Sequence, residues 1–114
     1  MTRAGAVAQR HLTLFNECVH SGDFSALLAE FAQDAVLKFE NVPGAGTLEF
    51  QGLQAITTAY EQQPPDDQID STAEAFEEGE SIVVPFAWRA DSSTGVMRLT
   101  YADGRLAQMV VIFD

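Results

Sequence analysis

The sequence predicts an α+β fold in which three N-terminal helices pack on one face of a curved, mostly antiparallel sheet. Apolar residues recur at helical spacing in the first part of the chain and alternate at period two in the last part. The later segments are separated by turn signals that contain glycine, as in a meander of strands. With 114 residues there is room for one hydrophobic core, so residues 1–114 are expected to form one domain.

Three segments have the features of helices. The first spans residues 2–20, where one stripe contains Val7, His11, Leu14, Phe15, Cys18 and Val19. Asp23 is placed to cap a second helix by accepting backbone N–H bonds, and that helix is expected to bury Phe24, Leu27, Leu28 and Phe31. Gly52 opens a third helix, which Pro64 ends because proline cannot continue the hydrogen-bonding pattern.

The remaining segments have the features of strands. Two short strands are expected at residues 36–39 and 47–50, followed after the third helix by strands at 69–76, 81–90, 96–101 and 105–114. The last two strands flank Asp103-Gly104, a strong signal for a two-residue turn. Such a turn would set Arg98 opposite Met109 and Val96 opposite Val111.

Charge and composition exclude several classes of function. The formal net charge is −11, and six Lys and Arg residues are too few for a nucleic-acid surface or an anionic membrane surface. No run of about eighteen apolar residues or signal-peptide pattern is present, so we expect no membrane partner and a cytoplasmic location. Cys18, the single cysteine, cannot form an internal disulfide. No metal-ligand spacing or phosphate loop is present, so we expect neither a metal nor a cofactor.

A likeness to a known superfamily is found in four stretches, residues 22–35, 50–62, 84–86 and 96–99. Over these stretches the chain resembles the NTF2-like (SnoaL-like) superfamily, and within it the ketosteroid isomerases. The resemblance implies a cone-shaped fold with a ligand pocket. It does not extend to the isomerase chemistry, because the positions of the oxyanion tyrosine, the general base and the second oxyanion donor correspond to Phe15, Phe39 and Val96. Tyr60 alone matches a supporting tyrosine of that family.

Two short motifs are similar to those of limonene-epoxide hydrolases. Phe39-Glu40-Asn41-Val42-Pro43 resembles a Tyr-x-Asn-x-Pro loop that holds a water molecule, and Arg89-Ala90-Asp91 resembles an Arg-x-Asp pair that protonates the epoxide. Phe39 replaces the tyrosine, and Val111 stands where that family has its last-strand aspartate. The likeness therefore implies roles for Asn41, Arg89 and Asp91, three of the five functional groups.

Three further polar residues each have two interpretations. His11 is either a general base aimed into the pocket or a packed histidine of the first helix. Glu40 is either a base whose pKa is raised by Phe39 and Val42 or a solvated loop residue. Arg98 is an oxyanion or anion donor if its strand face is the pocket, and a surface or interface residue otherwise. With the epoxide-hydrolase motifs, these considerations give five catalytic candidates, namely His11, Glu40, Asn41, Arg89 and Asp91.

The leading hypothesis is cofactor-free binding of a small apolar molecule, with isomerase, dehydratase, cyclase or epoxide-hydrolase chemistry as its enzymatic form. The expected pocket lining is Phe15, Phe39, Tyr60, Phe86, Trp88, Val96, Arg98, Met109, Val111 and Phe113. The alternative hypothesis is a non-catalytic association domain. In either case a homodimer through the sheet is expected, because the last two strands are apolar on both faces and would expose Met97, Leu99, Val110 and Ile112.

Overall fold

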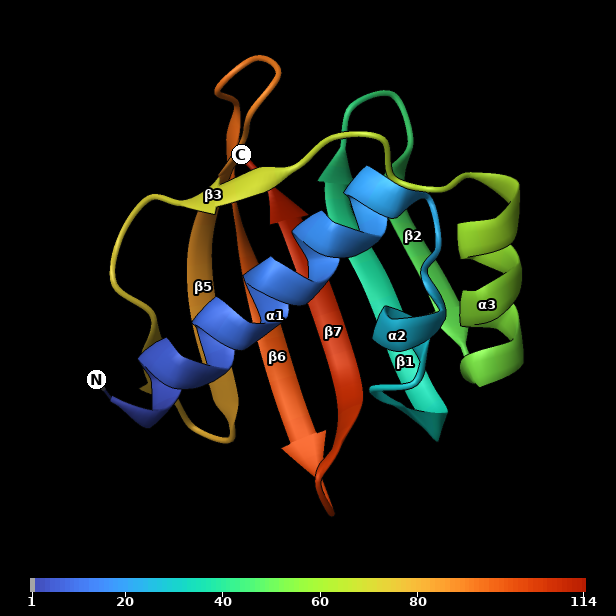
Figure 1. Cartoon of the computed structure of the whole chain (residues 1–114), viewed down its shortest axis with the longest axis horizontal. Coiled ribbons are helices and arrows are strands. Elements are labelled where there is room, and N and C mark those ends of the chain that lie inside the picture. Colours follow the sequence, from blue (N-terminus) through green and yellow to red (C-terminus); the bar gives the residue numbers. More distant parts are fainter. Residues whose placement is uncertain (1) are drawn as a thin grey trace.

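A long helix lies across one face of a curved sheet in the computed structural model, which describes residues 2–114 (Figure 1). The helices are α1 (Arg3–Ser21), α2 (Ser25–Leu28) and α3 (Leu53–Gln62). The strands are β1 (Phe31–Val42), β2 (Gly46–Gln51), β3 (Ile69–Ser71), β4 (Phe76–Glu78), β5 (Ser81–Trp88), β6 (Thr94–Ala102) and β7 (Arg105–Phe113). This arrangement confirms the predicted α+β fold class.

The sheet has seven strands in the order β2-β1-β7-β6-β5-β3, and β4 pairs with another part of β5. All pairs are antiparallel except β1 with β7. The strand expected at 36–39 is part of a longer β1, because pairing with both β2 and β7 extends it beyond its apolar segment. The strand expected at 69–76 is two short strands, since β3 and β4 pair with different ends of β5.

The ends of the first helix follow the usual capping rules. Thr2 Oγ1 accepts a hydrogen bond from the Gly5 N–H at 3.0 Å, and Gly22 ends the helix in the left-handed conformation with φ of 79°. The second helix is a single turn, and Asp23 is not its cap: it accepts from the Ser25 N–H at 2.9 Å while Phe24 holds the cap position. Phe31, expected in this helix, begins β1.

The register of β6 on β7 differs from the predicted one. Arg98 lies opposite Val110 and Val96 opposite Ile112, because an irregularity beside the Asp103-Gly104 turn shifts the pairing near Thr100 and Tyr101. A shift of one residue exchanges the two faces of a strand. Met97 and Leu99, expected on an exposed patch, are therefore buried in the core. Val96 and Arg98 lie on the opposite face of the sheet, away from α1, which we call the outer face.

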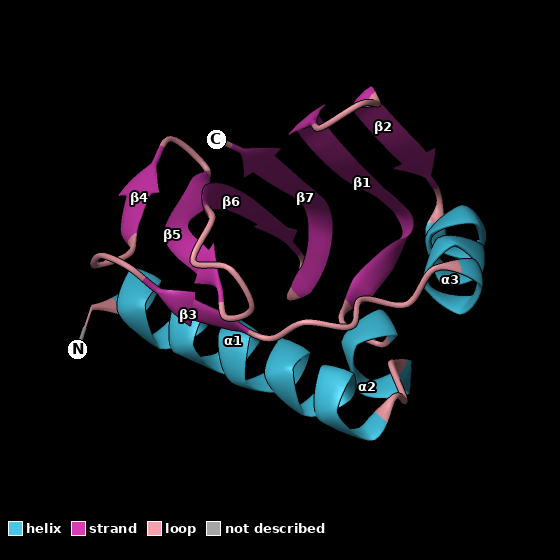
Figure 2. Cartoon of the chain, turned by 90° about the horizontal axis from the view of Figure 1, so that it is seen from above, coloured by secondary structure: helices cyan, strands magenta, loops and turns pink. Residues whose placement is uncertain are grey.

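The interior of the fold is closed by side chains from α1 and the inner face of the sheet. Ile82, Val84 and Phe86 of β5 are at most 2% exposed, and Leu99 and Met109 from the neighbouring strands join the same cluster. Seen from above, the sheet curves around α1, and α3 stands beside β1 and β2 at one end (Figure 2). Within residues 2–114, no helix has the length and apolar character needed to span a membrane.

Candidate functional site

A row of aromatic rings crosses the inner face of the sheet at the end where β1, β5 and β7 finish. Phe39 lies 6.4 Å from Phe50 and 6.5 Å from Phe113 between ring centroids. Phe113 in turn stacks on Trp88 at 6.3 Å, with an angle of 11° between the ring planes. Gly95 of β6 lies between the strands that carry Trp88 and Phe113, so no side chain from the intervening strand separates the two rings.

A pocket of about 200 Å³ opens beside this row, between β1, β2 and α3. It is lined by Leu37, Phe39, Val42, Leu48, Phe50, Ala59, Tyr60, Gln63, Pro65 and Phe113, which we call the ring pocket. Only the Tyr60 hydroxyl and the Gln63 amide supply polar side-chain groups. Apolar walls with few polar groups are typical of small-molecule sites.

A second pocket, of about 360 Å³, adjoins the ring pocket and shares Phe113 and Pro65 with it. We call it the rim pocket, and its other lining residues are Pro43, Asp66, Asp67, Trp88, Asp91 and Ser93. A larger hollow follows the exposed side of α1, but five of its eight lining residues are polar or charged. The two adjoining pockets are therefore the better candidate for a binding site.

The expected lining residues fall into three groups. Phe39, Tyr60 and Phe113 line the ring pocket, and Trp88 and Phe113 line the rim pocket. Four others, which were expected to line a cavity, instead pack in the closed core: Phe15, Phe86, Met109 and Val111. Val96 and Arg98 lie on the outer face, where Arg98 pairs with Glu78 at 2.9 Å, and so neither contributes to the pocket.

Two of the catalytic candidates lie near the end of β1, but neither lines the ring pocket or the rim pocket. Glu40 alternates with Phe39 onto the outer face and lies 3.5 Å from the ammonium group of Lys38. Asn41 has a positive φ of 59° and donates from Nδ2 to the carbonyl oxygen of Phe113 at 2.7 Å. Asn41 therefore ties β1 to the end of β7, a structural role that positions the Phe113 ring.

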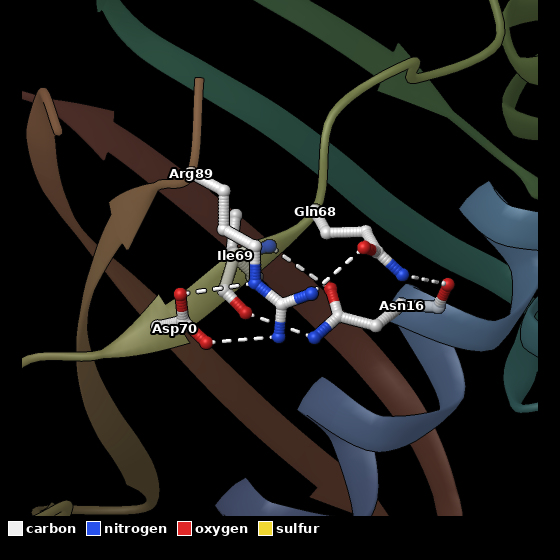
Figure 3. Close-up of polar contacts among 5 residues, drawn as sticks. All are labelled: Asn16, Gln68, Ile69, Asp70 and Arg89. Atoms are coloured by element: carbon white, nitrogen blue, oxygen red, sulfur yellow. Dashed lines mark hydrogen bonds and ion pairs between the residues drawn. The ribbon is translucent and has the colours of Figure 1, made fainter. Parts of the chain in front are cut away.

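Arg89 and Asp91 do not form the expected pair. The Arg89 guanidinium donates to both carboxylate oxygens of Asp70, at 3.0 and 2.9 Å, and to Gln68 Oε1 at 2.7 Å (Figure 3). Asp91 accepts instead from the backbone and hydroxyl of Ser93. The reason is topological: β3 lies beside the end of β5 and presents Asp70 to Arg89, which no short motif could indicate.

The Arg89 contacts belong to a network that fixes β3 against α1. The Asn16 side chain donates to the Ile69 carbonyl at 2.8 Å and accepts from the Ile69 N–H at 2.9 Å, as a neighbouring strand would (Figure 3). Gln68 Nε2 completes the network by donating to the Asn16 carbonyl at 3.0 Å. These bonds hold residue 68, so they also fix the preceding segment, which includes Pro65 of both pocket linings.

His11 is packed in the core, 3% exposed, and lines neither the ring pocket nor the rim pocket. Among residues 2–114 its Nε2 atom has no hydrogen-bond partner. Burial, with a smaller contribution from Arg10, lowers the pKa of His11 from 6.5 to about 4. The histidine is therefore neutral at pH 7, and its position does not allow it to act as a base on a molecule in the pockets.

Sequence reasoning missed most of the ring pocket's β2 and α3 wall. Leu48 and Phe50 lie two residues apart on β2 and so share a face, and Ala59 of α3 is one turn before Gln63, the C-cap residue of that helix. The sequence contains both of these periodicities, but neither reveals that α3 packs against β1 and β2. Burial, together with the core residue Cys18, raises the pKa of Tyr60, so its hydroxyl stays protonated at neutral pH. Among the ring-pocket residues only Tyr60 and Gln63 have polar side-chain atoms, and neither is a general base at neutral pH.

We expect no isomerisation of a 5-ene steroid ketone above the uncatalysed rate. Phe15 and Phe39 supply neither a base nor an oxyanion donor. Where the ketosteroid isomerases have their second oxyanion donor, the inward residues of β6 are Gly95 and Met97, and neither can donate from its side chain. Loss of one oxyanion donor costs roughly 10²–10³ in rate, and here all are missing. A spectrophotometric assay at neutral pH checks this, and turnover that a Tyr60→Phe variant abolishes would contradict it.

Comparison with solved structures identifies the fold. An NTF2-like protein of unknown function from Mesorhizobium loti superposes with a TM-score of 0.68 at 20% identity, over 100% of this chain and 96% of that one. The chain has the NTF2-like fold. No protein-family model and no curated protein matches the sequence.

Two other proteins with the NTF2-like fold carry functional descriptions. A Sinorhizobium meliloti protein assigned provisionally as a polyketide cyclase matches with a TM-score of 0.63 and 21% identity, over 90% of this chain and 93% of that one. A Bacillus subtilis protein assigned provisionally as an isomerase matches with a TM-score of 0.71 and 14% identity, over 99% of this chain and 90% of that one. At these identities the likeness establishes the fold, while function depends on the residues of the site.

Proposed function

We propose that this protein binds a small apolar molecule, about the size of one ring, in the ring pocket between β1, β2 and α3. The observation that carries the proposal is a pocket of about 200 Å³ whose ten lining residues are apolar apart from Tyr60 and Gln63. For scale, an engineered apolar cavity of about 150 Å³ in another protein takes up benzene. A fused-ring molecule such as a steroid is too large for the ring pocket alone.

Binding without catalysis fits the positions of the polar side chains. The five catalytic candidates lie in the core, on the outer face, at the end of β1 or in the loops after β5. Tyr60 is the only titratable residue of the ring-pocket lining, and its raised pKa makes it a poor base at neutral pH. The cyclase and isomerase descriptions of similar folds therefore supply no mechanism here.

Filling the ring pocket is expected to abolish binding. Ala59 lines the pocket from α3, and leucine there would occupy the space of the ligand while keeping high helix propensity. We expect Ala59→Leu to weaken binding of single-ring compounds at least tenfold. Fluorescence of Trp88, the only tryptophan, provides the signal, because its ring stacks on the pocket residue Phe113.

The matched control is Ala55→Leu, the same substitution one turn earlier on α3 and outside the ring-pocket lining. This variant is expected to bind as the parent protein does. Saturable fluorescence changes that survive Ala59→Leu would place the ligand elsewhere. A panel of single-ring compounds that leaves Trp88 unperturbed, and produces no chemical-shift changes in the ring-pocket residues, would refute the proposal.

A second candidate function is association through the outer face. This face carries apolar side chains on β4, β5, β6 and β7, namely Phe76, Val83, Pro85, Val96, Val110 and Ile112. Val83 and Val110 are buried, so the expected exposure of Val110 is wrong, and Phe76, Pro85, Val96 and Ile112 form the accessible part. Phe76 is 47% exposed at the β4 edge of this face. Arg98 lies among these side chains, opposite Val83 and Val110, and pairs with Glu78. At the β1 margin Lys38, opposite Val110, lies near Glu40 and Glu49, so charge borders the apolar residues on that side.

We expect a homodimer in solution that is disrupted by charge on the outer face. Val96→Asp should convert the dimer to monomer at tens of micromolar protein, because a carboxylate in an apolar interface is costly to desolvate. Light scattering measures the mass. Leu48→Asp, at an exposed leucine of the ring-pocket side, serves as the control and should leave the dimer intact. A parent protein that is monomeric at this concentration would overturn the association hypothesis.

A further inference from the structure

Phe113 lies between the ring pocket and the rim pocket. It is one of two residues that line both hollows, and Pro65 is the other. In the sheet, β7 with Phe113 runs between β1 and β5. The β1 residue Phe39 stacks on Phe113 and lines the ring pocket, whereas the β5 residue Trp88 stacks on Phe113 and lines the rim pocket. The Phe113 ring therefore separates the two hollows.

We propose that Phe113 limits the ligand to a single ring, because its side chain is the wall that closes the ring pocket toward the rim pocket. This inference rests on the proposed ring-binding function and names the residue that determines ligand size at that site. About 200 Å³ lies on one side of this wall and about 360 Å³ on the other. A rod-shaped molecule with two rings needs both spaces at once, and Phe113 excludes it.

The backbone of Phe113 is held by the strands on both sides of β7. Asn41, near the end of β1, donates from Nδ2 to the Phe113 carbonyl oxygen at 2.7 Å, and Phe113 pairs with Gly95 of β6 on the other side. The next residue, Asp114, donates its N–H to the Thr94 carbonyl oxygen at 3.3 Å. These contacts fix the backbone from which the ring extends.

The Phe113 ring is also confined by its aromatic neighbours. Its centroid lies 6.5 Å from that of Phe39 and 6.3 Å from that of Trp88, with angles of 28° and 11° between the ring planes. Stacked rings attract one another at these separations. Gly95 contributes no side chain between the two strands, so Trp88 reaches Phe113 directly. A ligand that moved Phe113 aside would lose both stacking contacts.

Phe50 is a matched aromatic residue that does not form the shared wall. It lies at the opposite end of the row, 6.4 Å from Phe39, and it lines the ring pocket without lining the rim pocket. Loss of the Phe50 ring would enlarge the ring pocket within its own walls. Loss of the Phe113 ring would instead remove the wall that both hollows share.

Two probes that differ by one ring test this inference. 2-Phenylethanol and 2-(4-biphenylyl)ethanol are titrated by calorimetry into the parent protein and into Phe113→Ala and Phe50→Ala. We expect the parent protein to bind the two-ring probe about tenfold more weakly than the single-ring probe, because the second ring has to stay in water or displace Phe113. Phe113→Ala should bind the two-ring probe about tenfold more tightly than the parent protein does, since the second ring is then buried in the joined space.

The position of the bound probe gives a second readout. In Phe113→Ala, nuclear Overhauser effects should connect one end of the two-ring probe to the Ala59 methyl group of the ring pocket and the other end to the Trp88 indole of the rim pocket. Phe50→Ala loses the same ring from the ring pocket alone, so it should keep the preference of the parent protein for the single-ring probe.

The outcomes separate this inference from ring binding itself. If the parent protein binds 2-phenylethanol but a folded Phe113→Ala gains no affinity for the two-ring probe, Phe113 is not the size limit and ring binding stands. Equal affinity of the two probes for the parent protein leads to the same conclusion. Absence of 2-phenylethanol binding by the parent protein would overturn both proposals. If the alanine variant does not fold, Phe113→Leu decides, because its shorter side chain should give a smaller gain in the same direction, and no gain would contradict the inference.

Discussion

Replacing Gly95 by alanine is expected to lower the free energy of unfolding by about 3 kcal/mol, a loss typical of overpacked cores. A Cβ atom at Gly95 would lie 2.7 Å from the Ile112 carbonyl oxygen and 2.9 Å from Phe86 Cζ. The first contact is with the backbone of a paired strand, and the second is with a ring that is 0% exposed. Neither neighbour can move without disturbing the sheet, so β6 and β7 must separate locally.

The direction of this effect distinguishes packing from backbone conformation. Gly95 is not among the residues with positive φ, so alanine could adopt its backbone angles without strain. In an open strand, the same substitution would stabilise the protein slightly. Urea unfolding measures the change. In a double-mutant cycle with Phe86→Leu, the double variant should lose less stability than the sum of the losses of the two single variants, because the smaller side chain removes one of the two contacts. An alanine variant as stable as the parent would contradict the packing argument.

Acidification from pH 7 to pH 5 is expected to lower the free energy of unfolding by about 2 kcal/mol through His11 alone. The pKa of His11 falls from 6.5 in the unfolded chain to about 4 in the buried site. Between these values the unfolded state binds a proton that the folded state does not bind. The contribution of His11 is therefore complete above pH 6.5 and is lost progressively as the pH falls towards 4.

His11→Leu should flatten this pH dependence and raise the stability at pH 5. At pH 7 it also removes a buried Nε2 atom that has no partner among residues 2–114, which favours the variant further. His20→Gln, at an exposed histidine nine residues along the same helix, is the control and should leave the slope unchanged. Denaturant unfolding at pH 7, 6 and 5 gives the comparison. A slope that His11→Leu leaves intact would show that other groups carry the acid sensitivity.

The identity and order of the main elements could be predicted from local patterns. The stripe from Val7 to Val19 specifies α1, Gly52 and Pro64 bracket α3, and alternation from Ile82 to Trp88 specifies the inner face of β5. Each of these features depends on neighbours within a few positions along the chain. The same is true of the apolar character of the interior, whereas its closure by Phe15, Phe86, Met109 and Val111 was not predicted.

The candidate site was less predictable, because it depends on which distant segments lie side by side. The pairing of Arg89 with Asp70 instead of Asp91 follows from the position of β3, and the place of Glu40 follows from the pleat of β1. One irregularity between β6 and β7 moved Val96 and Arg98 from the expected pocket to the outer face. Motif similarity does not detect a register shift of one residue, although such a shift changes the environment of every side chain on the strand.

The sequence by itself determined an acidic α+β chain with the NTF2-like arrangement of helices and strands, and it supplied an aromatic inner face that includes Phe39, Trp88 and Phe113. Only the tertiary structure decided where those rings leave space. Side chains of α1 fill the middle of the cone, while α3 stands against β1 and β2 and leaves the ring pocket open. The physical reason is that periodicity fixes the face on which a side chain lies, whereas a cavity depends on how closely elements remote in sequence approach each other.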